Sequence, residues 1–218
     1  MHSPRETTDE KIMARCVALS RVAVQKGEYP FAAIIARDNQ IIAEAINRRF
    51  RENDVTRHAE IIALSQAQKI LCRKDLRFCT IYSSIEPCAM CSFCIREAWI
   101  GRVVYALASP VMGGMSRWNI LRDGGMSGRI PQIFGPVPQI VSGVLAHEAE
   151  LAWEDWNPPA WYMIKRFGLL TDPRTADGDA RVHCGCGHSW WHALQVWLLR
   201  NGKAQADGPT LNLPHADL

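Results

Sequence analysis

The sequence lacks the features that would place it in a membrane or outside the cell. No apolar run approaches the roughly 18 to 20 residues that a membrane-spanning helix needs. The first residues, MHSPRETTDEKIMARC, lack the charged-then-apolar pattern of a secretory signal. We therefore expect a cytoplasmic protein that has no membrane partner.

Strong net charge is also lacking, because the 218 residues carry a formal charge of only +3 at pH 7. This small excess permits an anionic partner without requiring one. Hydrophobic residues make up 48% of the chain and charged residues 22%, which is typical of a soluble globular protein with a sizeable core. Internal repeats are absent from the sequence, so a repeat architecture is not expected.

Cysteine is not scarce, since the chain has eight. Disulfides are not expected, because the chain is large and shows no secretory signal. In a reducing compartment, clustered cysteines bind metal or pack as small hydrophobic side chains. Cys16, Cys72 and Cys79 stand in apolar contexts and are predicted to be core residues.

Strand and helix patterns alternate along the chain, which indicates an α/β protein. The pair Asp38–Asn39 between two apolar runs is a hairpin signal, so the sheet should be mixed rather than purely parallel. We predict a three-layer α/β/α sandwich with a mixed five-stranded sheet. Strands are expected at 31–37, 40–46, 78–84, 102–107 and 138–145, and helices at 9–26, 57–70 (with Thr56 or Asp54 near its cap), 88–99 and 146–156.

Two segments stand apart from this pattern. Residues 109–136 are rich in Gly, Ser, Met and Pro and too long for a simple connector, so we expect a functional or packing loop. The composition changes near residue 171, which predicts a domain over 1–170 and a loosely attached tail over 171–218. The tail could hold a second metal, although Cys-x-Cys flanked by glycine is not a standard finger spacing; its candidate ligands are His183, Cys184, Cys186, His188 and His192.

The chemistry-bearing residues stand at two predicted helix starts. His58 and Glu60 are two apart, a spacing that separates side chains inside a helix but lets both reach a site beyond its first turn. Cys88 and Cys91 are three apart and follow Pro87, where the positive helix end favours thiolate. One His nitrogen and two thiolates suit tetrahedral Zn²⁺ and leave the fourth position to water.

Glu60 is the carboxylate beside these three ligands. Zinc lowers the pKa of bound water to about 7, and Glu60 could carry a proton from that water to a leaving amine. A closed structural site with Cys94 as fourth ligand would leave Glu60 without a purpose. The same residues could also form a buried cysteine pair with a capping histidine, or a zinc site that stabilises an interaction protein without turnover.

The motifs HAE and PCAMC resemble those of the zinc-dependent cytidine deaminase superfamily. The similarity extends from about Phe31 to Trp156, and it implies the cytidine deaminase-like fold and usually a homodimer. It further implies one Zn²⁺ per chain held by His58, Cys88 and Cys91, with Glu60 as general acid/base. Glu86 should order a loop rather than react. The expected substrate-binding residues are Asn47, Phe31, Ala59, Ser84, Trp118 and Trp156.

The substrate is less well indicated by these resemblances. YPFAAII and IYSSIEPC are similar to bacterial guanine deaminases, and NRRF to fungal-type cytosine deaminases, which favours a small nucleobase or nucleoside substrate. HAEIIAL and IGRVVYA are similar to bacterial tRNA adenosine deaminases. Those enzymes tend to end in a basic helix, whereas EAELAWEDW is acidic and would repel a phosphate backbone. tRNA is therefore the alternative substrate.

Overall fold

The computed structural model of the chain describes residues 7–174. Five strands form one sheet: β1 (Ala32–Arg37), β2 (Gln40–Ile46), β3 (Cys79–Ile85), β4 (Arg102–Leu107) and β5 (Gln139–Ser142). The helices are α1 (Thr8–Gln25), α2 (Ala59–Leu71), α3 (Ala89–Glu97), the 3-10 helix η1 (Ile120–Arg122), α4 (Gly124–Arg129), α5 (Ala146–Trp156) and α6 (Pro158–Arg166).

The sheet has the strand order β2-β1-β3-β4-β5. β1 runs antiparallel to β2 and β3, whereas β3, β4 and β5 run parallel to one another. The turn between β1 and β2 uses Asp38 and Asn39, both in the left-handed region with φ of 49° and 64°, as the favoured two-residue hairpin turn requires. The predicted hairpin and mixed five-stranded sheet are confirmed.

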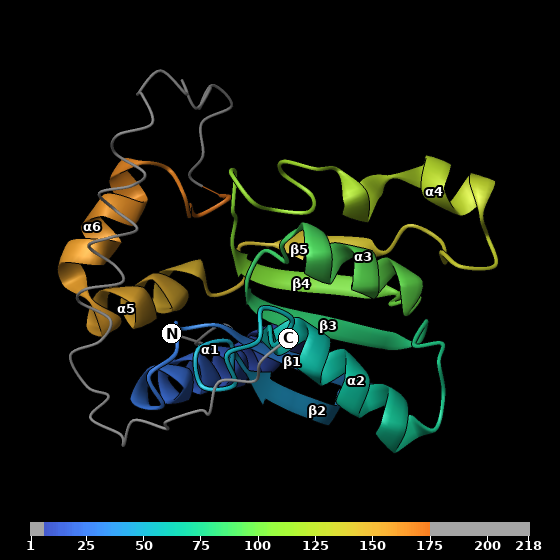
Figure 1. The fold of residues 1–218 in the computed structure, drawn as a ribbon, viewed down its shortest axis with the longest axis horizontal. Coiled ribbons are helices and arrows are strands. Elements are labelled where there is room, and N and C mark those ends of the chain that lie inside the picture. Colours follow the sequence, from blue (N-terminus) through green and yellow to red (C-terminus); the bar gives the residue numbers. More distant parts are fainter. Residues whose placement is uncertain (1–6, 175–218) are drawn as a thin grey trace, which may run out of the picture. The chain divides into compact units, whose positions relative to one another are not determined.

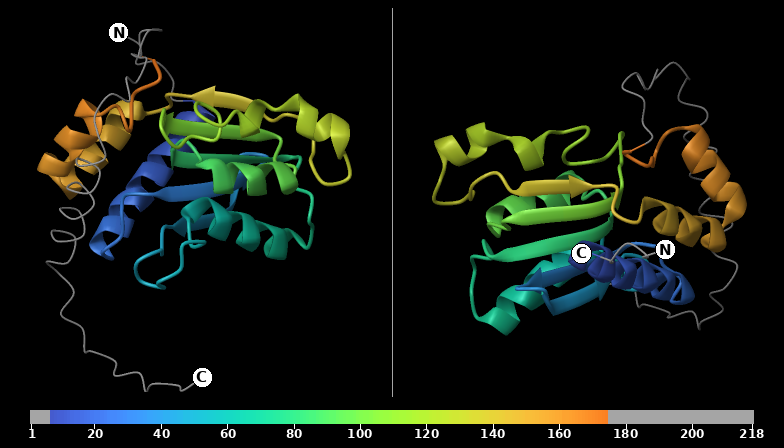
Figure 2. Two further views of the ribbon diagram at one scale, coloured as in Figure 1. Left: turned by 45° about the horizontal axis from the view of Figure 1, so that its top comes forward. Right: turned by 180° about the vertical axis from the view of Figure 1, so that it is seen from behind.

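Helices cover both faces of the sheet (Figures 1 and 2), so the predicted three-layer sandwich is confirmed. Side chains alternate across the strands, so that Ile34 packs with α1 and α5 while Ile35 packs with α2 and α3. The second of these cores lies behind the starts of α2 and α3, which carry the motif residues. The fold thus places both motifs over the same face of the sheet.

Helix α1 is fixed at its start by sequence-local and long-range polar contacts. Thr7 and Glu10 form a capping box, as the spacing Thr-x-x-Glu predicts. Asp9 accepts hydrogen bonds from Arg102 Nη1 at 2.7 Å and from the Tyr82 hydroxyl at 2.8 Å. The bond from Arg102 holds the pKa of Asp9 below its usual range. The carboxylate therefore ties α1 to β3 and β4.

Three sequence expectations need correction or addition. Cys16 and Cys79 are buried as predicted, but Cys72 is exposed because it ends α2 in a left-handed conformation, with φ of 51°. The 109–136 segment is not a plain loop, since it contains η1 and α4. Helix α6 was not predicted, although Asn157 caps it and Pro158 stands at its first position.

The end of the described chain still contacts the sheet. Thr171 and Ala108 exchange two backbone hydrogen bonds, of 2.8 and 3.0 Å. The proposed boundary at residue 170 stays a prediction, and the Cys/His cluster of the tail lies outside the described residues. Within 7–174, none of the helices combines the length and apolar character needed to cross a membrane.

Candidate metal centre

Helices α2 and α3, which carry the two motifs, each begin at a residue of a type that can bind metal. His58 is the N-cap of α2 and Cys88 the N-cap of α3, and neither side chain makes a capping hydrogen bond. Thr56 and Asp54 are bonded to each other in the turn before the helix, so neither of them is the cap. The two N-cap side chains can therefore point beyond the helix ends.

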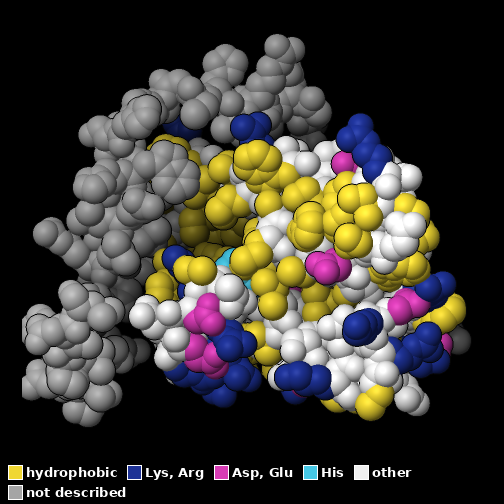
Figure 3. Space-filling model, turned by 45° about the vertical axis from the view of Figure 1, so that its right-hand side comes forward, with side chains coloured by type: hydrophobic (Ala, Val, Ile, Leu, Met, Phe, Trp, Pro, Cys, Tyr) yellow, Lys and Arg dark blue, Asp and Glu magenta, His cyan; other side chains and the backbone are white. Residues whose placement is uncertain are grey.

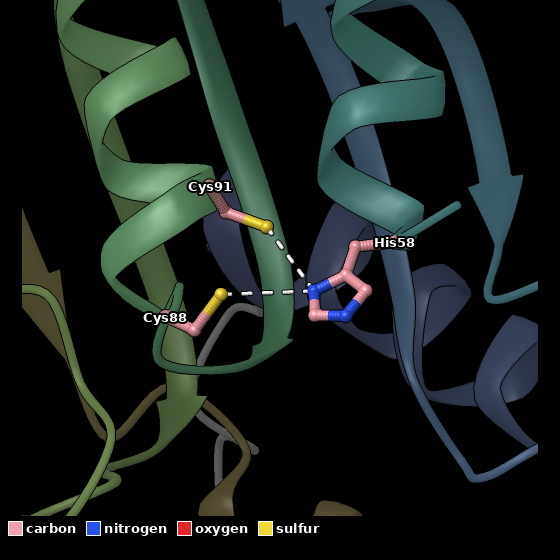
Figure 4. Close-up of side chains that lie close together, drawn as sticks. All are labelled: His58, Cys88 and Cys91. Carbon is pink, nitrogen blue, oxygen red and sulfur yellow. Dashed lines mark hydrogen bonds between the residues drawn. The ribbon is translucent and has the colours of Figure 1, made fainter. Parts of the chain in front are cut away.

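The three expected ligands lie together at these helix starts (Figure 4). His58 Nδ1 is 3.6 Å from Cys88 Sγ and 3.5 Å from Cys91 Sγ. Tetrahedral coordination, with Zn–N of about 2.0 Å and Zn–S of about 2.3 Å, puts N and S about 3.5 Å apart. The residues present therefore fit Zn²⁺ without rearrangement.

The Cys88 thiol, at the start of α3, has a lowered pKa. The hydrogen bond from Cys91 and the one from His58 lower the pKa of the Cys88 thiol to about 4, against the effect of burial. The contact with Cys88 raises the pKa of His58. The lowered pKa favours the thiolate form of Cys88, which is the form that binds metal.

Glu60 lies in the first turn of α2 and is buried, with 8% of its surface exposed. Its Oε1 accepts a hydrogen bond from the Ser83 hydroxyl at 3.3 Å. Burial raises the pKa of Glu60, and the charge on Cys88 acts in the same direction. A carboxylate that accepts a proton more readily than usual is suited to proton transfer.

Cys94 does not join this group. Among residues 7–174, the only set of three or more His, Cys, Asp or Glu side chains able to share a metal is His58, Cys88 and Cys91. Cys94 is half-buried on the next turn of α3. Three protein ligands, rather than four, match a site that keeps an open position.

Asn47 directly follows β2 and lies close to His58, because the backbone N–H of Arg48 donates to the carbonyl of Arg57 at 3.0 Å. Its side-chain Nδ2 donates to the buried Glu28 at 2.8 Å. Sequence reasoning missed Glu28, which lies in the break GEYP after α1. Nothing local in the sequence signals its burial, because its partners lie 19 to 23 residues away.

Glu86 orders the loop after β4, as predicted. Its buried carboxylate accepts from the backbone N–H groups of Ser109 at 2.8 Å, Met115 at 3.0 Å and Ser116 at 2.7 Å. Gly113 pairs with Cys88 in an isolated bridge. The loop is thereby held against the start of α3, beside the metal ligands.

The far part of the same loop is held by Arg96 of α3, which sequence reasoning also missed. This side chain is 1% exposed and donates to the carbonyls of Ile120 at 2.8 Å and Asp123 at 3.0 Å. Arg96 also donates to Ser127. Residues just before α3 therefore hold the start of the 109–136 segment, and Arg96 of α3 holds its middle.

The remaining expected substrate residues differ in their surroundings. Ala59 is fully buried at the start of α2, and the Ser84 hydroxyl is engaged with Pro30 and Ala32 inside the fold. Trp118 is 57% exposed, and its ring lies under the Arg117 guanidinium. The role of these three residues in binding stays a prediction.

Phe31 and Trp156 belong to an aromatic cluster centred on Tyr29. The Tyr29 ring lies 6.2 Å from Phe31, 5.2 Å from Trp156 and 5.0 Å from Phe50. Trp153 joins the cluster but is buried in the core. Figure 3 shows hydrophobic side chains around a hollow in which a histidine is visible.

Residues 6–107 match the family model described as the cytidine and deoxycytidylate deaminase zinc-binding region. The chain is 34% identical over 118 residues to the tRNA-specific adenosine deaminase of Aquifex aeolicus, covering 54% of this chain and 78% of that protein. It is 32% identical over 143 residues to the probable cytosine deaminase of Schizosaccharomyces pombe, covering 66% and 82%. It also matches 22% of the length of the tRNA(Ile)-lysidine synthase of Deinococcus radiodurans, at 33% identity over 63% of this chain.

Two solved structures have a fold similar to that of this chain. The guanine deaminase from Nitrosomonas europaea matches with a TM-score of 0.57 at 25% identity, over 72% of this chain and 86% of that one. A structure from a study of A-to-I editing by tRNA deaminases matches with a TM-score of 0.55 at 29% identity, over 65% and 98%. Sequence, fold and ligand geometry agree, and the chain belongs to the family defined by the cytidine and deoxycytidylate deaminase zinc-binding region.

Proposed function

We propose that the protein is a zinc-dependent hydrolytic deaminase that acts on a small nucleobase or nucleoside of guanine or cytosine type. The observation that supports this proposal is the grouping of His58, Cys88 and Cys91, three side chains able to hold a metal, with the buried carboxylate of Glu60 beside them. In the reaction, the oxygen of water replaces the exocyclic amine on a ring carbon, and the amine leaves as ammonia. We further propose that each chain holds one zinc and that the protein is a cytoplasmic homodimer. Light scattering would test the dimer.

The roles of the chain's own residues follow from their positions. Zinc held by His58, Cys88 and Cys91 would act as a Lewis acid that activates the attacking water. Glu60 takes a proton at its carboxylate and passes it to the leaving amine. Ser83 donates to Glu60 Oε1 and so fixes the orientation of that carboxylate. Asn47, next to His58 across the loop, binds the base.

A small substrate is favoured by the surfaces around the site. Helix α5 carries Glu148, Glu150, Glu154 and Asp155, and acidic side chains repel a phosphate backbone. The aromatic cluster of Tyr29, Phe31, Phe50 and Trp156 offers ring faces on which a base can stack. Both features suit a compact, uncharged heterocycle.

Adenosine in tRNA is the second candidate. The loop between Asn47 and His58 carries Arg48, Arg49, Arg51 and Arg57. Arg49 is exposed and lies over the Phe50 ring at 5.6 Å, and within the described part of the chain it forms no ion pair. A relative named tRNA-specific adenosine deaminase also supports this candidate.

An ammonia-release screen separates the candidates. Guanine, cytosine, adenine, their nucleosides, aminotriazines and tRNA would each be offered to the zinc-loaded protein, with Glu60→Gln as the control. We expect release from guanine or cytosine or from one of their nucleosides. Release from tRNA alone would establish the second candidate. A protein that holds zinc and releases no ammonia from any of them would instead be a non-catalytic interaction protein.

A further inference from the structure

Glu28 is a buried carboxylate that the deamination chemistry does not use. Its side chain is 2% exposed, and its three partners are all N–H donors. These are Asn47 Nδ2 at 2.8 Å, the backbone of Arg51 at 2.9 Å and the backbone of Phe50 at 3.3 Å. Burying a carboxylate costs free energy unless its oxygens are hydrogen-bonded. Both carboxylate oxygens accept hydrogen bonds, which indicates a specific task for this side chain.

One consequence is that the Asn47 amide has a fixed orientation. A carboxylate can only accept hydrogen bonds, so the amide nitrogen must face Glu28 and Oδ1 must point elsewhere. Asn47 is 3% exposed, which leaves the amide little room to turn over. Oδ1 has no hydrogen-bond partner among residues 7–174. This oxygen is therefore available to a ligand.

The same carboxylate also fixes the loop that leads to the metal. Phe50 and Arg51 lie in the middle of this loop, and both donate their backbone N–H groups to Glu28. The loop is closed by the hydrogen bond from Arg48 to Arg57, next to His58. Glu28 thus sets the position of Asn47 relative to the first metal ligand.

We propose that Glu28 is a positioning residue that presents Oδ1 of Asn47 to the substrate, where it accepts a hydrogen bond from an N–H group of the base. This inference rests on the proposed function, in which Asn47 binds the base. It selects substrates that carry an N–H donor at the position facing Asn47. A substrate with only an acceptor there would leave Oδ1 buried and unpaired, which is costly.

The direct test is Glu28→Gln, which keeps the shape and replaces one oxygen with a donor. The new NH₂ group must either face the backbone N–H of Arg51, donor against donor, or force the Asn47 amide to turn over. We expect kcat/KM to fall about 10- to 100-fold, mainly through a rise in KM, with zinc per chain unchanged. The matched control is Glu44→Gln on β2, the strand that leads to Asn47, because Glu44 pairs with Arg15 away from the site; its kcat/KM should stay at the wild-type value.

A double-mutant cycle separates positioning from general stabilisation. If Glu28 acts through Asn47, Glu28→Gln has no further effect on kcat/KM in an Asn47→Ala background. Additive losses, or a wild-type kcat/KM for Glu28→Gln alone, would overturn the proposal. If the wild-type protein releases ammonia from no substrate, the proposed function fails. The ¹⁵N NMR signal of the Asn47 side-chain amide then tests whether Glu28 fixes the orientation of that amide. Movement of that signal in Glu28→Gln supports the fixed amide, and an unmoved signal refutes it.

Discussion

Replacing Glu60 with Gln should remove turnover while the fold and the zinc stay in place. The two side chains have nearly the same shape, and the Ser83 hydroxyl, 3.3 Å from Glu60 Oε1, can donate equally well to an amide oxygen. An amide cannot take up and release the proton, however. Proton transfer by a positioned side chain contributes about 10²- to 10⁴-fold to the rate, or about 2.7 to 5.4 kcal/mol of activation free energy.

The assay is ammonia release from the substrate found by the screen, measured beside zinc per chain and melting temperature. Ser83→Ala is the companion variant, because it removes only the group that orients Glu60. Its kcat should fall by about 10- to 100-fold, less than in Glu60→Gln, since one hydrogen bond to a carboxylate contributes about 1.5–3 kcal/mol. A Glu60→Gln protein that binds zinc and keeps more than about a tenth of the wild-type kcat would refute the assignment of Glu60 as the proton carrier.

Three further results should follow from the structure. Chelation should lower the melting temperature reversibly, because zinc held by His58 and Cys88 would link the N-caps of α2 and α3; an unchanged melting temperature would contradict this. Gly114→Ala puts a methyl group 1.9 Å from the Ser92 hydroxyl oxygen and should cost about 1–3 kcal/mol in urea unfolding, whereas Gly124→Ala meets nothing within 4 Å and should be neutral; equal costs would argue against the loop packing described. Asp9→Asn should cost about 1 kcal/mol at pH 7 and progressively less as the pH falls below the usual pKa of an aspartate, because stabilisation by a carboxylate with a lowered pKa is present above its unfolded pKa and lost as the pH falls through the folded one; a cost in unfolding free energy that does not fall with pH would rule out the ion pair with Arg102.

The regular elements could be predicted because their signals are local. The two apolar runs on either side of the Asp38–Asn39 turn place β1 and β2, and the bounds of β2, β4 and α5 agree with the expected ranges. Cys72 was misplaced because an apolar context does not show that a residue ends a helix in a left-handed conformation. Helix α6 was missed although Asn157 and Pro158 are recognised start signals and its buried residues Ala160, Trp161 and Ile164 recur at helical spacing.

The metal ligands could be predicted for a similar reason. Cys88 and Cys91 are three apart at a helix start, so their spacing along the chain predicts their proximity. His58 is 30 residues from Cys88, and the motif at the start of α2 marked it as their partner. The residues that surround the base depend instead on long-range contacts. Glu28 could not be found, because its burial arises only when the loop after β2 folds back on it. The exposure of Trp118 could not be predicted either, since it depends on how α3 holds the 109–136 segment.

The hydrogen bonds that the loop after β4 donates to Glu86 affect how such a site can change during evolution. Three of its four hydrogen bonds go to backbone N–H groups, which every residue except proline provides. Side chains along that loop can therefore be exchanged without loosening its attachment beside the zinc ligands. Directed-evolution libraries confined to Val111, Met112, Met115, Arg117 and Trp118 should then yield folded, zinc-loaded proteins at high frequency, so that new substrates can be sought without rebuilding the metal centre.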